Sequence, residues 1–145
     1  MALRALGRAL APALTRASSS TPTVFDRMVQ IFVIDKSGVR HTVRGLEGAS
    51  LASALQEYGG FGDDSFMPHV FEPGLPDCHV YVQGDYLDKL PPLDGEAAQD
   101  HARVLETAVR AKARDNSRMA HYIALTPALN GMTVALGDVE PWETQ

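Results

Sequence analysis

The spacing of apolar and polar residues changes several times along the chain, and each change predicts an element. Residues 28–34 (MVQIFVI) are mostly apolar and rich in β-branched side chains, as in a buried strand. Residues 39–44 (VRHTVR) alternate apolar with polar positions. The intervening residues 35–38 (DKSG) favour a turn, because Asp and Ser bond their own backbone and Gly tolerates positive φ. The pattern therefore predicts a β-hairpin.

Two other stretches have helical spacing. The first follows Ser50, a favoured N-cap residue, and stops at Gly59-Gly60, which predicts a helix over residues 51–58. The second follows Asp94, another residue suited to an N-cap, and predicts a helix over residues 96–114. The expected apolar stripe of this second helix comprises Ala98, Ala102, Leu105 and Val109.

The remaining elements are short. Residues 59–77 form a Gly-, Pro- and Asp-rich stretch, and an irregular segment of this length is usually a binding loop. Strands are expected at residues 78–82, 119–126 and 133–136, with a turn or short helix at 85–90. The order β-β-α-loop-β-α-β-β predicts an α+β fold of β-grasp type, a mixed sheet with a helix packed across one face.

The first 23 residues have a composition unlike the rest. They contain Arg4, Arg8 and Arg16, no acidic residue, leucines at helical spacing and a Ser/Thr-rich end. This composition is typical of a mitochondrial targeting segment. The alternative is a basic helix that the protein retains. In either case the folded domain is expected over residues 24–145.

Composition narrows the function classes. The chain has 145 residues, enough for one domain, and a net charge of −5, which argues against nucleic-acid binding. No apolar run approaches the roughly 18 residues of a membrane-spanning helix. The only cysteine is Cys78, which excludes an intrachain disulfide, a four-cysteine zinc site and an all-cysteine iron–sulfur cluster within one chain.

Three short motifs carry a family resemblance. They are Cys78-His79-Val80, Ser117-Arg118-Met119 and Met132-Thr133-Val134. With the order of the predicted elements, residues 28–136 resemble the mitochondrial, adrenodoxin-like branch of the [2Fe–2S] ferredoxins. The resemblance implies a ferredoxin-type β-grasp fold.

The same resemblance identifies the cluster-ligand positions. The family uses the pattern C-x5-C-x2-C and a fourth cysteine just after the Ser-Arg segment. In this chain His69, Leu75 and Cys78 occupy the first three positions, and His121 occupies the fourth. Leucine cannot donate to a metal, so no [2Fe–2S] cluster is expected. We predict instead that His69, Cys78 and His121 hold one mononuclear iron or zinc ion.

The fourth ligand of this predicted ion stays open between water, Asp77 and Glu72. No catalytic residue is expected, because no oxyanion hole and no pair of a base with its orienting group accompanies Cys78.

A narrower resemblance covers residues 87–92 (LDKLPP), 125–132 (LTPALNGM) and Pro141-Trp142. These residues are similar to the ferredoxin-like accessory subunit of mitochondrial complex I (NADH:ubiquinone oxidoreductase) in plants and algae. The resemblance implies a non-enzymatic, non-redox assembly subunit that bridges the matrix and membrane arms. It would be peripheral to the membrane, on the matrix side of the inner membrane, beside carbonic-anhydrase-like subunits and an acyl carrier protein-containing module. The alternative is a soluble mitochondrial ferredoxin-type electron carrier with an atypical iron–sulfur cluster.

Overall fold

The computed structural model describes residues 21–62, 65–72 and 74–139. All but the last three residues of the predicted targeting segment 1–23 lie outside these ranges, as does Pro141-Trp142. The boundary between a targeting segment and a domain at 24–145 therefore stays a prediction.

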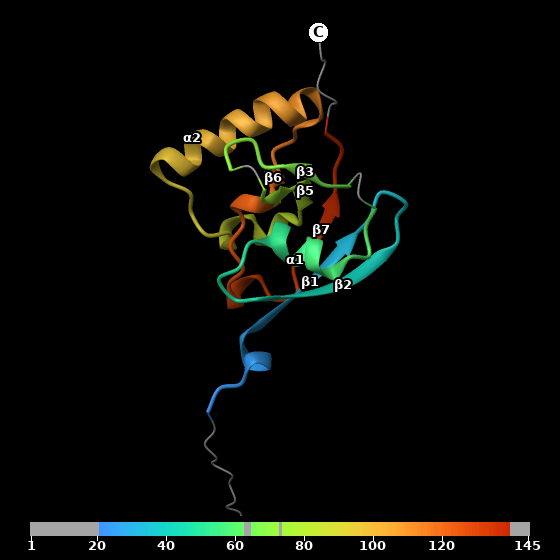
Figure 1. The fold of residues 1–145 in the computed structure, drawn as a ribbon, viewed down its shortest axis with the longest axis vertical. Coiled ribbons are helices and arrows are strands. Elements are labelled where there is room, and N and C mark those ends of the chain that lie inside the picture. The colour runs from blue at the N-terminus through green and yellow to red at the C-terminus, as the bar shows by residue number, and fades with distance from the viewer. Residues whose placement is uncertain (1–20, 63–64, 73, 140–145) are drawn as a thin grey trace, which may run out of the picture.

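A five-stranded sheet with the order β2-β1-β7-β5-β6 forms the framework (Figure 1). Its strands are β1 (Met28–Ile34), β2 (Arg40–Leu46), β5 (His79–Val82), β6 (Ser117–Met119) and β7 (Thr133–Leu136). Strands β1 and β2 form the predicted antiparallel hairpin, β1 and β7 are parallel, and the other neighbours are antiparallel. This mixed sheet confirms the predicted α+β, β-grasp class.

Helix α1 (Leu51–Tyr58) has the predicted bounds, because both of its ends carry strong local signals. The hydroxyl of Ser50 accepts a hydrogen bond from the backbone N–H of Ser53 at 3.1 Å. Gly59 ends the helix with a φ of 72°, a conformation that glycine adopts without steric penalty. Its apolar side joins the main core, whose largest fully buried side chains include Ile31, Leu51, Leu55 and Leu125.

Helix α2 (Gly95–Val104) differs from the prediction in length and in its buried face. It continues as a π-helical turn (Leu105–Val109) and a 3₁₀ turn, and the side chain of Asp94 makes no capping bond.

The predicted stripe is wrong in part: Val109 is buried, but Ala98 and Leu105 are half-buried and Ala102 is exposed. The helix instead buries His101, Val104 and Ala108. Because α2 packs against β6 through His101 and Val104, the other three residues of the predicted stripe, Ala98, Ala102 and Leu105, line a surface groove instead of the core.

The predicted strand 119–126 is also largely wrong. After β6 the chain forms a 3₁₀ turn (Ala120–Tyr122), and Ala124 makes an isolated bridge to Ser50. The turn forms because the backbone N–H of His121 bonds the side chain of Asp77 instead of a neighbouring strand. The turn thus brings His121 toward the loop.

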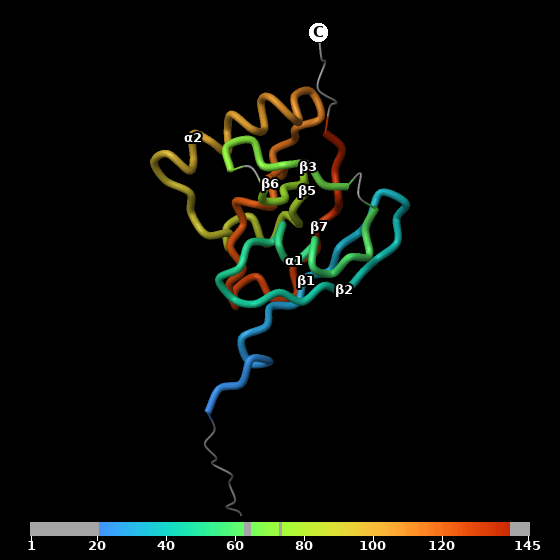
Figure 2. Tube along the Cα trace, viewed as in Figure 1, coloured from blue at the N-terminus to red at the C-terminus, as the bar shows by residue number. Residues whose placement is uncertain are grey.

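The predicted loop is mostly irregular in its described part. Its only strands there are the two-residue pair β3 (Met67–Pro68) and β4 (Pro76–Asp77). In Figure 2 this green segment runs beside the orange segment that leads into the 3₁₀ turn. Among the described residues, none of the helices has the length and apolar character needed to span a membrane.

Candidate functional site

His69 and His121 meet where the loop lies against the Ala120–Tyr122 turn. Their ring centroids are 3.9 Å apart and the planes are tilted by 41°. Glu72 joins them, with Oε2 at 3.8 Å from His121 Nε2. One donor atom from each of these three residues lies within 4.8 Å of the others, which makes the group a possible metal-binding cluster. His69 is buried, His121 is half-buried and Glu72 is exposed.

Cys78 lies outside this group of donors. It is 1% exposed, and burial raises the pKa of its thiol well above the usual range. Leu75, at the remaining family ligand position, is 42% exposed and has no donor atom. The structure therefore brings together two of the three predicted ligands, and it adds Glu72, one of the candidates for the fourth position.

Both ring nitrogens of His69 have partners in the loop and the turn. Nδ1 accepts the backbone N–H of Glu72 at 2.9 Å, so the neutral ring carries its proton on Nε2, which lies 3.0 Å from the Tyr122 hydroxyl. Burial, and then the nearby His121, lower the pKa of His69. Burial raises the pKa of Tyr122 to about 12, so the phenol stays protonated near neutral pH. The sequence analysis missed Tyr122, whose only signal is its place next to His121.

Asp77 ties the loop to the same turn. Its Oδ1 accepts the backbone N–H of Cys78 at 2.8 Å and that of His121 at 2.9 Å. The side chain is fully buried, and Oδ2 has no hydrogen-bond partner among the described residues. Burial raises the pKa of this carboxyl to about 6. A single acidic side chain thus holds the backbone at two of the predicted ligand positions.

His79 braces the sheet beneath the site. Its Nδ1 lies 2.8 Å from the carbonyl oxygen of Asp138, and its Nε2 lies 2.8 Å from the hydroxyl of Ser117. Because a carbonyl only accepts, Nδ1 carries the proton and Nε2 accepts from Ser117. A Cβ at Gly137 would lie 2.4 Å from Nδ1, so only glycine leaves room for this ring.

Comparison with known proteins identifies relatives of one type. No protein-family model matches the chain. "Adrenodoxin-like protein 1, mitochondrial" of Drosophila melanogaster is 33% identical over 117 residues, which cover 79% of this chain and 62% of that protein. Putidaredoxin of Pseudomonas putida is 28% identical over 111 residues, covering 77% of this chain and 97% of putidaredoxin. "Ferredoxin-2, mitochondrial" of Xenopus laevis is 30% identical, and the match covers 77% of this chain but only 53% of that protein.

Solved structures agree with the sequence relatives. A ferredoxin from Rhodopseudomonas palustris HaA2 superposes with a TM-score of 0.58 at 24% identity, covering 74% of this chain and 95% of that one. Putidaredoxin in its covalent complex with putidaredoxin reductase superposes with a TM-score of 0.56 at 28% identity, covering 75% and 98% of the two chains. The chain therefore has the adrenodoxin/putidaredoxin-like [2Fe–2S] ferredoxin fold.

These relatives overturn the predicted cofactor. A mononuclear iron or zinc ion in place of a [2Fe–2S] cluster was expected, but the similar chains are ferredoxins, and one putidaredoxin among them is described as an Fe2S2 ferredoxin. That prediction is contradicted by the fold's relatives.

The donors of this chain nevertheless do not fit a cluster held by four thiolates. Of the four family positions, one holds a thiol, two hold imidazoles and one holds the apolar Leu75. The thiol is buried and protonated, and His69 and the backbone of His121 are bonded within the protein.

Proposed function

We propose that this chain is a ferredoxin-type protein of mitochondrial electron transport and acts as an electron carrier. The observation that carries the proposal is the adrenodoxin/putidaredoxin-like fold, with three side chains that could hold a metal ion, His69, Glu72 and His121, gathered beside its loop. Two relatives, from Drosophila melanogaster and Xenopus laevis, are named as mitochondrial proteins, which supports the same compartment for this chain. The basic composition of residues 1–23 agrees with that location.

For the carrier, the proposed iron ligands are His69, Cys78 and His121, with Glu72 in place of the apolar Leu75. Imidazole replaces thiolate in Rieske-type [2Fe–2S] centres, so two histidines are compatible with iron–sulfur chemistry. Glu72 is the fourth ligand we favour, since its carboxylate already lies near His121. Cys78 has to lose its proton and approach the other donors, because its buried thiol lies outside their group.

Anaerobic reconstitution with iron and sulfide tests the carrier. We expect bound iron and acid-labile sulfide in near-equal amounts, visible absorption, and a paramagnetic signal on reduction. His69→Ala, Cys78→Ser and His121→Ala should each lower the bound iron. His41→Ala is the matched control, because His41 lies on β2 and bonds Asp35 and Tyr58. A colourless protein without sulfide, folded by circular dichroism, would overturn the carrier.

A second candidate is a non-redox accessory subunit of complex I. The observation that favours a non-redox role is that the loop is held by the protein's own hydrogen bonds, whereas the assignment to complex I rests on the sequence resemblance over residues 87–92 and 125–132. His69 bonds Tyr122 and the backbone of Glu72, and Asp77 bonds the backbone of Cys78 and His121. Such a chain would act through its surfaces, on the matrix side of the inner membrane, with carbonic-anhydrase-like subunits and an acyl carrier protein-containing module as partners.

Native gel electrophoresis of mitochondria tests this second role independently of the metal analysis. A tagged chain that serves as a subunit should migrate with complex I and cross-link to the two named partner types. Migration only as a small free protein would exclude the role. A free protein that contains iron and sulfide would identify the carrier instead.

A further inference from the structure

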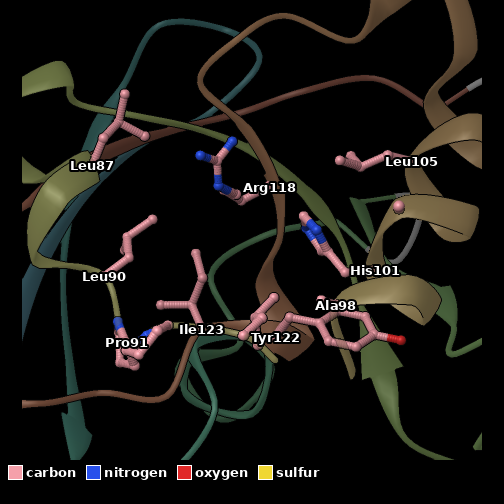
Figure 3. A pocket seen from close by; sticks show the side chains of 12 residues that line it. Leu87, Leu90, Pro91, Ala98, His101, Leu105, Arg118, Tyr122 and Ile123 are labelled. Atoms are coloured by element: carbon pink, nitrogen blue, oxygen red, sulfur yellow. The ribbon is translucent and has the colours of Figure 1, made fainter. Parts of the chain in front are cut away.

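Tyr122, whose ring contacts those of His69 and His121, also lines a second concavity. This concavity has a volume of about 420 Å³ and is enclosed by the Gly84–Lys89 turn and the segment after it, by α2 and by the chain from β6 to Ile123 (Figure 3). Most of its lining is apolar and includes Leu87, Leu90, Leu93, Ala98, Leu105 and Ile123. This apolar groove is formed by the face of α2 that the sequence predicted to be buried.

Arg118 is the one permanently charged side chain in the lining of the groove. It is half-buried, and its Nη1 donates to the backbone carbonyls of Asp115 at 2.9 Å and Ser117 at 2.7 Å. Within the described ranges, no carboxylate lies at ion-pair distance from it. Carbonyl oxygens do not neutralise a guanidinium, and a cation that loses hydration without a counter-charge is unfavourable. The guanidinium of Arg118 is therefore partly buried without a carboxylate counter-charge among the described residues.

His101 supplies a second hydrogen-bond donor to the groove. Its Nε2 accepts the backbone N–H of Met119 at 3.1 Å, so the neutral ring carries its proton on Nδ1. Among the described residues Nδ1 has no hydrogen-bond partner. Burial and the charge of Arg118 lower the pKa of His101 to about 4, which keeps the ring neutral at physiological pH. In Figure 3 the ring of His101 and the guanidinium of Arg118 lie on the same cavity.

We propose that this groove binds a small amphiphilic monocarboxylate of the medium-chain fatty-acid class. The carboxylate would be held by Arg118 and the Nδ1–H of His101, and the aliphatic chain would lie along the leucines. The volume falls in the range of small-molecule sites, which are mostly apolar with a few orienting polar groups. A neutral ligand would give Arg118 no counter-charge. A short carboxylate would leave the apolar lining of the groove exposed to water.

Calorimetric titration of the full chain with decanoate, below its micelle concentration, tests the site. We expect saturable binding of one decanoate per chain. Decanol has the same chain without the charge, and butyrate has the same head group with little chain. Each should bind at least about tenfold more weakly, since a charge-assisted hydrogen bond or several buried methylenes contribute that much. Equal binding of decanol and decanoate would overturn the proposal.

Two variants locate the ligand within the groove. Arg118→Gln removes the charge, and Ala102→Trp fills the apolar part while it keeps Arg118. Both should weaken decanoate at least about tenfold. Arg103→Gln is the control, because Arg103 is the next residue on α2, its side chain is 66% exposed, and it is not in the lining.

Thermal unfolding verifies that each variant is folded before it is compared. If Ala102→Trp binds decanoate as the wild type does, the ligand lies elsewhere and the proposal is wrong. If decanoate fails to saturate the wild-type chain, the groove is not a fatty-acid site. In that case the groove would instead be tested as a binding site for an acidic segment of a partner protein.

Discussion

The two ends of this molecule are stabilised in different ways. Around α1, β1 and β2 the core consists of aliphatic side chains such as Ile31, Val43, Leu51 and Leu55. At the other end, where the loop meets α2, β5 and β6, polar side chains are buried as well. They are His69, Asp77, His79, His101 and Ser117.

The difference teaches where substitutions are tolerated. Apolar burial is non-directional, so the effect of a substitution around α1, β1 and β2 on stability depends on how much side-chain volume it removes or adds. A buried polar group needs a particular partner at a particular angle, so the second end depends on individual hydrogen bonds. We therefore name the two regions the apolar end and the polar end.

The largest effect is expected at the apolar end, from Leu55→Ala. Leu55 is fully buried in the main core, and loss of its side chain should lower the free energy of unfolding by about 2–5 kcal/mol in urea titrations. Leu46→Ala is the control, because Leu46 is 46% exposed and should change stability by less than about 0.5 kcal/mol. Equal effects of the two changes would contradict the description of this core.

Asp77→Asn tests the polar end through its pH dependence. The pKa of Asp77 is raised from 3.8 to about 6 in the folded chain, so the folded state binds more protons than the unfolded state between these values. The free energy of unfolding should therefore decrease by about 2–3 kcal/mol as the pH rises from about 4 to above 6. The variant should lack this contribution.

Urea unfolding at several pH values, with a chelator present, measures the difference between the wild type and Asp77→Asn. Asp88→Asn, on an exposed turn, controls for the chemistry of the substitution. Parallel stability curves for the wild type and Asp77→Asn would show that the buried carboxyl does not titrate in this range.

His79→Leu should be less severe than removal of a core leucine. The apolar replacement keeps the volume but removes the acceptor for the Ser117 hydroxyl, which keeps only the N–H of Arg114, and the donor to the carbonyl of Asp138, which should lower stability by about 2 kcal/mol. Hydrogen exchange should increase at β5 and β6 in particular. His41→Leu is the control, because its partners Asp35 and Tyr58 remain accessible to water; an equal loss there would be unexpected.

The smallest effect is expected for the cap of α1. Ser50→Ala removes the hydroxyl that accepts the N–H of Ser53 and should lower stability by about 1 kcal/mol in thermal unfolding. Ser53→Ala keeps the N–H that the cap accepts and loses only the hydroxyl that bonds Ser50 Oγ at 2.9 Å, so it should be close to neutral because alanine favours helices. A larger loss for Ser53→Ala than for Ser50→Ala would show that the cap is not the important contact.

Most of the apolar end could be predicted from local sequence. The hairpin of β1 and β2 and the bounds of α1 follow from strand periodicity, turn residues and caps within a few positions of each other. The candidate ligand residues came from the family pattern, and the structure places His69 beside His121. The contacts that hold this pair were not predictable, because Asp77 bonds a backbone 44 residues away and His69 bonds Tyr122 53 residues away.

The amino-acid sequence by itself determined the class of fold, the order of its elements and the single thiol of Cys78, because periodicity and composition are local properties. The tertiary structure alone decided which face of α2 is buried. Helical spacing shows which residues share a face, but it cannot choose between Ala98 with Ala102 and His101 with Val104. It also decided that no carboxylate among the described residues lies at ion-pair distance from Arg118, since charge pairing depends on distances in space that the order of residues does not contain.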